Sequence, residues 1–286
     1  MRFGVQLMYE RLSEPEFLVG AGQLVEELGF DSLWLADHVV VPAGYTSVYP
    51  YNSAGRVPVV RFPEPVVSLA TLAGMTKRVE LGTAVLVLPQ RNPIVLAKQV
   101  ATLDALAGGR VRLGVGVGWL REEFEALGAE FDDRGARTNE YIDAMRKLWT
   151  QDQPRYDGKH VRLDGTFELV PRPGRPGGVA VIVGGHSPVA ARRAARRGDG
   201  FFPFTVDPAA LAPLYDAVRT EAASAERPID EIELLGPTTT LPGWTARLQD
   251  MGVTHAVMPS GPPDLDLEQL KARLRRFSER VIERTR

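Results

Sequence analysis

The 286-residue chain contains no cysteine, which excludes disulfide bonds, a thiol nucleophile and zinc or iron–sulfur sites that use thiolate ligands. It also lacks an excess of charge, because 34 basic residues oppose 36 acidic ones and leave a formal net charge of −2. That balance offers no long-range attraction to nucleic acid or to a membrane surface. No apolar run approaches the roughly 18 residues of a membrane helix, and Met1–Val5 carries no charged-then-apolar signal. We therefore expect a cytoplasmic protein that binds neither nucleic acid nor membrane.

Lysine and histidine are also scarce, and their positions exclude further chemistries. A Schiff-base lysine needs burial on a strand, whereas the lysines at positions 77, 98, 147 and 271 fall on predicted helices or helix ends. The histidines, at positions 38, 160, 186 and 255, show no metal-ligand spacing, and no Gly-x-Ser-x-Gly motif is present. The sequence therefore argues against an aldolase, a metal-dependent hydrolase and a serine hydrolase, and we expect no metal site.

Short apolar runs alternate with amphipathic stretches along the chain. Strands are predicted over Phe3–Leu7, Ser32–Ala36, Val79–Val87, Arg110–Gly118, Val179–Val183, Asp199–Phe204, Ile232–Gly236 and Thr254–Pro259. Helices are predicted over Pro15–Leu28, Glu64–Met75, Pro93–Ala107, Thr138–Thr150, Pro188–Arg197 and Asp266–Arg284. Because parallel strands need a crossover, eight such units favour an α/β fold, a closed (β/α)8 TIM barrel that forms a single domain over residues 1–286. An open doubly wound sheet stays as the alternative.

Two segments, at about residues 40–63 and 151–178, interrupt this alternation. The first follows a strand and is long for a loop without a function, so we expect it at the barrel mouth as a wall or lid over a pocket. Its aromatic and basic residues are Tyr45, Tyr49, Tyr51, Arg56, Arg61 and Phe62. The second carries the turns Asp157-Gly158 and Asp164-Gly165, which predict a β-hairpin excursion before the fifth strand, with a structural role.

Asp37 and His38 directly follow the second predicted strand, at the rim where barrel residues act on substrate. A histidine there can move a proton near neutral pH, and the neighbouring carboxylate can tune it. A histidine that only caps the rim through hydrogen bonds explains the position equally well.

Three glycines, Gly114, Gly116 and Gly118, lie on one face of the fourth predicted strand. Glycine at such positions is typical of close approach by another backbone, a helix or a ligand. Their spacing differs from the G-x-G-x-x-G of a dinucleotide fold, and tight packing is the favoured interpretation from the residues alone.

A second glycine motif, Gly184-Gly185, leads from the fifth strand into a helix that begins after Ser187. Free backbone N–H groups at a helix start, with glycines that let a ligand approach, favour a phosphate there. Arg137, near the start of the preceding predicted helix, either adds a basic contact to a phosphorylated cofactor or balances the neighbouring Asp133 at the surface.

In this order the motifs resemble the luciferase-like flavin and deazaflavin oxidoreductases, the luciferase-like monooxygenase superfamily, and most closely its coenzyme F420-dependent branch. The matching stretches are Glu27–His38, Leu81–Leu86, Asn92–Asp104, Gly114–Phe124, Gly184–Ser187 and Gly198–Gly200. The resemblance is good over roughly residues 1–204 and extends beyond them by element order alone. It implies an eight-stranded barrel that carries the cofactor in its mouth.

The same resemblance implies roles for individual residues. A non-prolyl cis peptide would join Ala84 to Val85 in the third strand, in a bulge that backs the central ring of the cofactor. His38 matches the family's active-site histidine, as a proton donor or a polariser of substrate, and Asp37 would orient it or contact the ring. The residues implied for cofactor binding are Thr83, Ala84, Val85, Gly116, Val117, Gly118, Arg137, Gly184, Gly185, His186 and Ser187.

One departure from the family concerns the substrate. Sugar-phosphate dehydrogenases of this branch carry a glutamate general acid near the end of the fourth strand, where this chain has Trp119. Glu122 and Glu123 are a few residues away and are not obvious replacements, so we do not expect a sugar phosphate. The residues expected in a more apolar substrate pocket are Trp119 and Tyr49, with Arg56 or Arg91 available for an anionic group.

The resemblance thus implies a coenzyme F420-dependent oxidoreductase that transfers a hydride between the deazaflavin and a small organic substrate. An FMN-dependent luciferase-like monooxygenase, which uses reduced flavin and oxygen, stays open as an alternative. So does a barrel that binds a flavin or deazaflavin without catalysis, and a homodimer stays open as the assembly.

Overall fold

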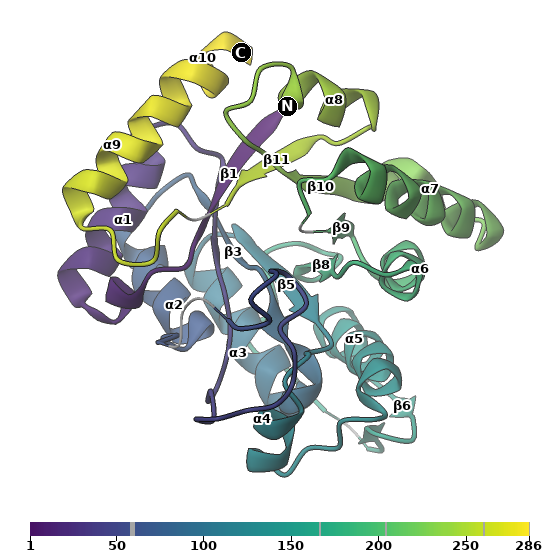
Figure 1. Cartoon of the computed structure of the whole chain (residues 1–286). Coiled ribbons are helices and arrows are strands. Elements are labelled where there is room, and N and C mark those ends of the chain that lie inside the picture. The colour runs from purple at the N-terminus through teal and green to yellow at the C-terminus, as the bar shows by residue number, and fades with distance from the viewer. Residues whose placement is uncertain (58–60, 166, 204, 260, 286) are drawn as a thin grey trace.

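Parallel strands form the centre of the molecule, and helices surround them (Figure 1). The computed structural model describes residues 1–57, 61–165, 167–203, 205–259 and 261–285. The barrel strands are β1 (Arg2–Leu7), β2 (Ser32–Leu35), β3 (Glu80–Thr83), β4 (Leu86–Val87), β5 (Val111–Gly116), β8 (Ala180–Gly184), β9 (Gly200–Phe202), β10 (Glu233–Pro237) and β11 (His255–Met258). They pair in the order β3-β2-β1-β11-β10-β9-β8-β5, and a β3–β5 pairing closes the ring. β3 and β4 are two parts of the third strand of the barrel, since both pair with β5. The described chain therefore has eight strand positions and confirms the predicted (β/α)8 barrel.

The predicted strands are present, with ends that differ by one or two residues, and two of them show a notable change. The run Val79–Val87 is divided into β3 and β4 where the Ala84–Val85 peptide is cis, as the resemblance implied. The run Arg110–Gly118 ends as β5 at Gly116, because Gly118 has a φ of 82°, outside the extended region. The sixth predicted strand reached residue 204, which lies outside the described residues.

Helices cover the outside of the barrel. They are α1 (Pro15–Glu27), α2 (Pro65–Met75), α3 (Pro93–Leu106), α4 (Arg121–Ala126), α5 (Arg134–Thr150), α6 (Pro188–Arg197), α7 (Pro208–Ser224), α8 (Trp244–Asp250), α9 (Leu267–Phe277) and α10 (Glu283–Thr285). The predicted terminal helix is interrupted between α9 and α10 by the π-helical turn Ser278–Ile282. The sequence pattern misses α7 and α8, and α7 contains Pro213, which is typical of a helix end. Over the described ranges, no helix has both the length and the hydropathy to span a bilayer.

The second excursion forms the predicted hairpin. Its strands β6 (Tyr156–Asp157) and β7 (Arg162–Leu163) pair antiparallel. The turn lies against α5, where the Glu140 carboxylate accepts a hydrogen bond of 2.8 Å from the His160 N–H. Residue 166 of this excursion lies outside the described residues.

The inside of the barrel is filled beneath its mouth. Trp34, Ile182, Phe202, Leu235 and Val257 pack together as an apolar plug, separate from the larger core between the strands and the helices. The carboxyl ends of the strands, above this plug, are therefore where the barrel has room for a ligand.

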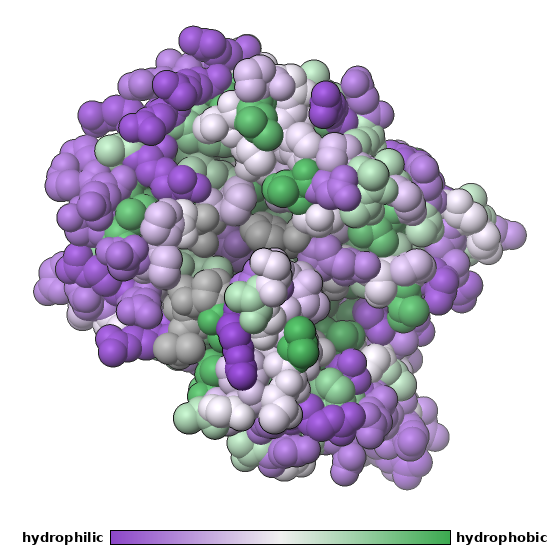
Figure 2. Space-filling view, viewed as in Figure 1, coloured by the Kyte–Doolittle hydropathy of each residue, from purple (hydrophilic) through white to green (hydrophobic). Residues whose placement is uncertain are grey.

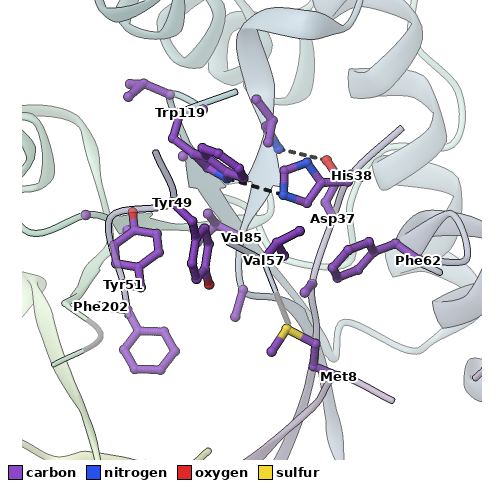
Figure 3. A pocket seen from close by; sticks show the side chains of 18 of the residues that line it. Met8, Asp37, His38, Tyr49, Tyr51, Val57, Phe62, Val85, Trp119 and Phe202 are labelled. Atoms are coloured by element: carbon purple, nitrogen blue, oxygen red, sulfur yellow. Dashed lines mark hydrogen bonds between the residues drawn. The ribbon is translucent and has the colours of Figure 1, made fainter. Parts of the chain in front are cut away.

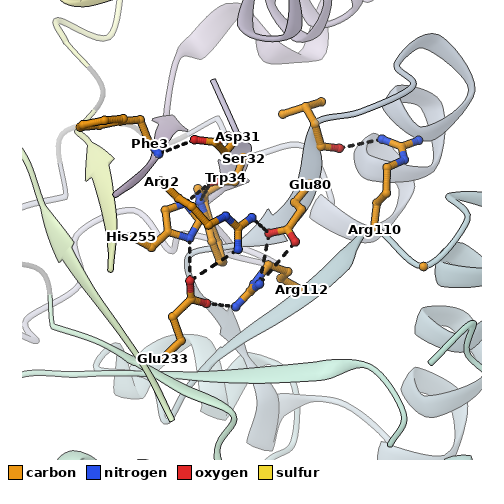
Figure 4. Close-up of polar contacts among 12 residues, drawn as sticks. Arg2, Phe3, Asp31, Ser32, Trp34, Glu80, Arg110, Arg112, Glu233 and His255 are labelled. Carbon is orange, nitrogen blue, oxygen red and sulfur yellow. Dashed lines mark hydrogen bonds and ion pairs between the residues drawn. The ribbon is translucent and has the colours of Figure 1, made fainter. Parts of the chain in front are cut away.

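A polar network lies at the opposite, amino-terminal end of the strands (Figure 4). Arg112 forms ion pairs with both Glu80 and Glu233. The fully buried His255 places Nε2 2.7 Å from the Ser32 hydroxyl and Nδ1 3.4 Å from the Glu233 carboxylate. Burial lowers the pKa of His255 below its ordinary value, although Glu233 opposes that effect. Burial alone would raise the pKa of Glu233, but the His255 hydrogen bond and Arg112 outweigh it and lower this pKa to about 2.

This network makes stability sensitive to acid. Since the pKa of His255 is lower in the folded chain, the unfolded chain binds its proton more tightly, and stability is lost as the pH falls below about 6.5. The lowered pKa of Glu233 acts in the same direction between about pH 4.5 and 2. We expect the free energy of unfolding from urea denaturation to fall between about pH 7.5 and 5, and to fall less in His255→Gln. Equal pH dependence in the two proteins would contradict this assignment.

Candidate active site

A pocket lies at the carboxyl ends of the barrel strands, between the β3–β4 bulge, the end of β5 and the segment that follows β2 (Figure 3). Its lining is mainly aromatic and apolar, with two histidines and a carboxylate among the side chains. The predicted site residues that line it are Asp37, His38, Tyr49, Ala84, Val85, Gly116, Val117, Gly118, Trp119, Gly184, Gly185 and His186. Thr83, Arg137, Ser187 and Arg56 do not line it.

His38 is held by partners on both ring nitrogens (Figure 3). Its Nδ1 lies 2.9 Å from the Glu123 carboxylate, and its Nε2 accepts a hydrogen bond of 3.3 Å from the Trp119 indole N–H. Because an indole N–H can only donate, the neutral ring carries its proton on Nδ1 and keeps its lone pair on Nε2. The ring is therefore fixed in one tautomer, with Nε2 as the atom free to exchange a proton with a ligand that displaces the indole.

Glu123 is the site residue that the sequence interpretation undervalued. Its carboxylate is 1% exposed and also accepts hydrogen bonds from the backbone N–H groups of Val39, at 2.6 Å, and Val40, at 3.2 Å. Burial works to raise the pKa of this carboxyl, but the hydrogen bonds from His38 and Val39 outweigh it and lower the pKa. Glu123 lies outside the pocket lining, so it does not replace a general acid there. It contacts His38 at Nδ1, the ring nitrogen opposite the one that Trp119 contacts. The one signal for it in the sequence is local: Glu122 and Glu123 are acidic residues of the kind typical of a first helical turn, and they lie in the first turn of α4.

Asp37 does not orient His38, contrary to one of its two expected roles. Its fully buried carboxylate binds the Arg91 guanidinium through two hydrogen bonds, of 2.7 and 2.9 Å, and accepts a third of 2.8 Å from the Val87 N–H. Burial raises the pKa of the Asp37 carboxyl, and the Arg91 ion pair opposes that rise. Asp37, which follows β2, therefore links that end of the strand to β4 through Val87. Its other expected role, contact with a cofactor ring, stays a prediction.

The bulge between β3 and β4 presents Val85 to the pocket (Figure 3). The Gln6 side-chain amide donates a 2.9 Å hydrogen bond to the Ala84 carbonyl, which holds the bulge from β1. A Cβ at Gly116 would lie 2.5 Å from one methyl of Val85, and a Cβ at Gly184 would lie 2.5 Å from the other. Glycine at these two positions is thus required by the bulge itself.

Gly114 in β5 and Gly118, two residues after its end, confirm close packing as well. A Cβ at Gly114 would lie 1.7 Å from the Thr83 carbonyl oxygen, so this position meets backbone and not a ligand. The Thr83 hydroxyl donates to the Gly114 carbonyl at 2.7 Å, away from the pocket, which differs from its expected cofactor contact. Gly118, by contrast, meets Phe124 and still lines the pocket.

The glycine turn after β8 forms the helix start that the sequence predicts. Ser187 is the N-cap of α6, and its side chain accepts a hydrogen bond from the Ala190 N–H. Gly185 has a φ of 137°, a conformation that side chains rarely tolerate, and a Cβ there would lie 2.8 Å from that of Ala190. Gly185 and His186 are half-buried and line the pocket, and α6 begins beside them after the exposed Ser187.

Three arginines expected near ligands have protein partners instead. Arg137 pairs with Asp133 at 2.7 Å, which agrees with the surface-charge alternative. The Arg56 guanidinium donates to the Tyr45 carbonyl at 2.6 Å and lies over the Tyr45 ring, while Arg91 binds Asp37. Among the described residues, none of those lining the pocket is a lysine or an arginine. The described lining therefore offers no lysine or arginine to a charged substrate group.

The segment after β2 supplies the expected aromatic wall, although residues 58–60 lie outside the described part. Tyr49 lies 5.1 Å from Trp119 between ring centroids, and Tyr51 lies 4.6 Å from the ring of His186. Burial, with smaller effects of neighbouring tyrosines, raises the pKa of Tyr49 to about 12, so its hydroxyl stays protonated. In Figure 2 white and green residues occupy the middle of this face, whereas its rim is mainly hydrophilic.

Comparison of the chain with known proteins identifies a family. A family model described as luciferase-like monooxygenase matches residues 1–246. An uncharacterized protein of Mycobacterium tuberculosis is 33% identical over 288 residues, which cover 96% of this chain and 97% of that protein. An F420-dependent glucose-6-phosphate dehydrogenase of Amycolatopsis mediterranei is 34% identical over 225 residues, which cover 77% of this chain and 63% of that protein.

Solved structures share the fold. The monooxygenase RslO1 from Streptomyces bottropensis is 20% identical, with a TM-score of 0.82 and full coverage of both chains. The coenzyme F420-dependent tetrahydromethanopterin reductase from Methanopyrus kandleri is 17% identical, with a TM-score of 0.79 over 100% of this chain and 99% of that one. At these identities the likeness establishes the barrel and not the reaction.

Proposed function

Because the chain belongs to the luciferase-like monooxygenase family and is an enzyme, we propose that it is a coenzyme F420-dependent oxidoreductase. Its reaction is hydride transfer between the deazaflavin and a small, uncharged organic substrate such as a secondary alcohol or a ketone. The observation that carries the proposal is the contact between His38 and Glu123. His38 lines the pocket beside the Ala84–Val85 bulge, and the buried Glu123 carboxylate binds its Nδ1 from outside the pocket. Relatives named F420-dependent glucose-6-phosphate dehydrogenase, at 34% and 35% identity, support the cofactor.

The residues at the mouth fit such a cofactor. A flat ring would rest against the bulge at Val85 and the end of β5 at Val117, which both line the pocket. A phosphate would bind at Gly184, Gly185 and the α6 amino terminus, where the two glycines line the pocket and the helix dipole favours an anion. When bound, F420 supplies or accepts the hydride, and the protein supplies binding, orientation and proton transfer.

Proton transfer is the part that we assign to His38. As a ketone becomes an alcohol its oxygen needs a proton, and in the reverse direction the hydroxyl must lose one. His38 gives or takes that proton at Nε2, while Glu123 stabilises the charged imidazole through Nδ1. The Trp119 indole N–H occupies Nε2 until the substrate displaces it, Glu123 keeps the ring oriented through Nδ1, and the protonated Tyr49 hydroxyl stays a hydrogen-bond donor.

The uncharged substrate follows from the pocket lining. With the α6 amino terminus assigned to the phosphate of the cofactor, a sugar phosphate would lack a charged partner, because the described lining contains no lysine or arginine. Arg56 and Arg91 are held by Tyr45 and Asp37 outside it. This chain therefore differs in its proposed substrate from the glucose-6-phosphate dehydrogenases that it resembles in sequence.

A second candidate is an FMN-dependent monooxygenase, which the likeness to the monooxygenase RslO1 favours. Titration of the cofactor-free protein with F420 and with FMN, followed by tryptophan fluorescence, separates the two candidates. We expect F420 to quench the fluorescence and to bind at least about tenfold more tightly than FMN. Tighter binding of FMN would overturn the deazaflavin assignment. Trp119→Phe is the control, because it removes the indole in the pocket and should remove most of the quenching.

A further inference from the structure

Glu122, next to the histidine's partner Glu123, binds a different part of the same loop. Its Oε1 accepts hydrogen bonds from the backbone N–H groups of Thr46, at 2.6 Å, and Ser47, at 3.0 Å, and from the Thr46 hydroxyl at 2.9 Å. Its Oε2 accepts another of 2.7 Å from the Ser47 hydroxyl. These bonds, the one from Ser47 foremost, lower the pKa of Glu122 to about 2. The carboxylate therefore stays charged, and the contact persists, across the neutral range.

The segment that Glu122 binds, residues 41–57, is internally bonded. The Tyr45 hydroxyl accepts a 3.0 Å hydrogen bond from the Val57 N–H, and the Tyr45 carbonyl accepts one from Arg56. Tyr45 and Val57 form a small apolar cluster with Leu120, the residue before α4. The segment thus behaves as one packed unit, which is attached to the amino-terminal end of α4.

This unit carries the outer wall of the pocket (Figure 3). Tyr49 packs edge-on against Trp119, and Tyr51 reaches across the mouth to His186 at the glycine turn after β8. Neither tyrosine is bonded to Glu122, so the carboxylate can influence the pocket only through the segment. Displacement of the segment would move both rings and enlarge the space beside His38.

We propose that Glu122 is a positioning residue, which fixes the segment 41–57 as the outer wall and so sets the size of the substrate that reaches His38. The kinetic part of this inference rests on the proposed function. Glu123 and Glu122 then divide two tasks between neighbouring positions of α4. Glu123 acts on the proton-transferring ring, and Glu122 acts on the shape of the substrate space.

Hydrogen exchange tests the hold on the segment without any cofactor. In Glu122→Ala we expect the amides of Thr46 and Ser47 to exchange at least about tenfold faster than in the wild type, because their acceptor is removed. Glu122→Gln keeps an acceptor oxygen and should restore most of the protection. Glu125→Gln, an exposed position on the same helix, is the matched control and should change nothing. Unchanged exchange in Glu122→Ala would overturn the proposal.

Kinetics test the effect on the substrate space, with reduced F420 and two ketones of different size, acetone and acetophenone. For Glu122→Ala we expect KM for acetone to rise about tenfold, kcat to stay within about twofold, and kcat/KM to shift toward acetophenone. A fall in kcat with KM and size preference unchanged would overturn the proposal. Absence of F420 turnover in the wild type would instead refute the proposed function, and the exchange experiment would still decide whether Glu122 holds the segment.

Discussion

The His38→Ala variant is expected to lose about 10²- to 10⁴-fold in kcat, while its affinity for F420 stays within about twofold of the wild type. The substrate oxygen loses its proton partner, whereas the surfaces assigned to the cofactor, at Val85 and Gly184, are unchanged. Turnover with F420 gives kcat, and tryptophan fluorescence gives the affinity. His160→Ala, on the hairpin and outside the pocket, is the control and should keep its activity.

The neighbouring variant Glu123→Gln distinguishes proton transfer from mere packing. A neutral amide does not stabilise a charged imidazole, so the pH at which kcat is half-maximal should move to lower values. A structural role alone would lower activity equally at every pH. Full activity in His38→Ala would exclude the proton-transfer role and leave the interpretation of His38 as a capping residue.

A loss of cofactor affinity is expected for Gly184→Ala. Its added methyl would lie 2.5 Å from a methyl of Val85, so the valine must move into the space assigned to the ring. Overpacking of this kind costs about 1–3 kcal/mol, and we expect the dissociation constant for F420 to rise at least about tenfold. Fluorescence titration measures the affinity, and urea denaturation measures the stability.

Two further variants test the mechanism of this loss. Gly184→Ala combined with Val85→Ala removes the clash and should recover part of the affinity, which a double-mutant cycle would register as coupling. Gly74→Ala, on α2 with open space around its Cβ position, is the matched control and should bind F420 normally. If Gly184→Ala binds F420 as the wild type does, Val85 does not define the ring space.

The barrel could be predicted because its signals are local. Apolar runs such as Ser32–Ala36 and helix signals such as Ser187 before Pro188 lie within a few residues of each other. The helix α7 escaped prediction because Pro213 lies inside it, where the tertiary packing of Leu211 and Tyr215 outweighs the cost of one proline. The Ala84–Val85 cis peptide followed from family resemblance and not from any propensity of these residues.

The site was predictable in position and less so in its contacts. His38 and Gly184 line the pocket as expected, because each lies at the carboxyl end of a strand that the sequence predicts. The partner of His38 could not be found, since Glu123 lies 85 residues away and α4 meets the loop only in the folded chain. The short distance in sequence favoured Asp37 instead, whose carboxylate is bound by Arg91, 54 residues away.

For the arginines too, the partners that bind them in the folded chain could not be read from the sequence with certainty. Arg56 was expected at a ligand because nothing in the sequence names its partner, and for Arg137 the sequence left a phosphorylated cofactor and the neighbouring Asp133 open. In the structure Asp133 and the Tyr45 carbonyl bind them, and the pocket is left without their charge. The expectation of an apolar substrate pocket around Trp119 and Tyr49 agrees with the lining that results.

The central claim, hydride transfer to or from F420 at this pocket, is tested most directly by turnover without oxygen. The enzyme is mixed anaerobically with oxidised F420 and 2-propanol, or with reduced F420 and acetone, and the absorbance of the oxidised deazaflavin is followed. The account predicts that, without oxygen, this absorbance falls with the alcohol and rises with the ketone. In His38→Ala both absorbance changes should be lost. Turnover that requires oxygen and reduced FMN, with no change in F420, would contradict it.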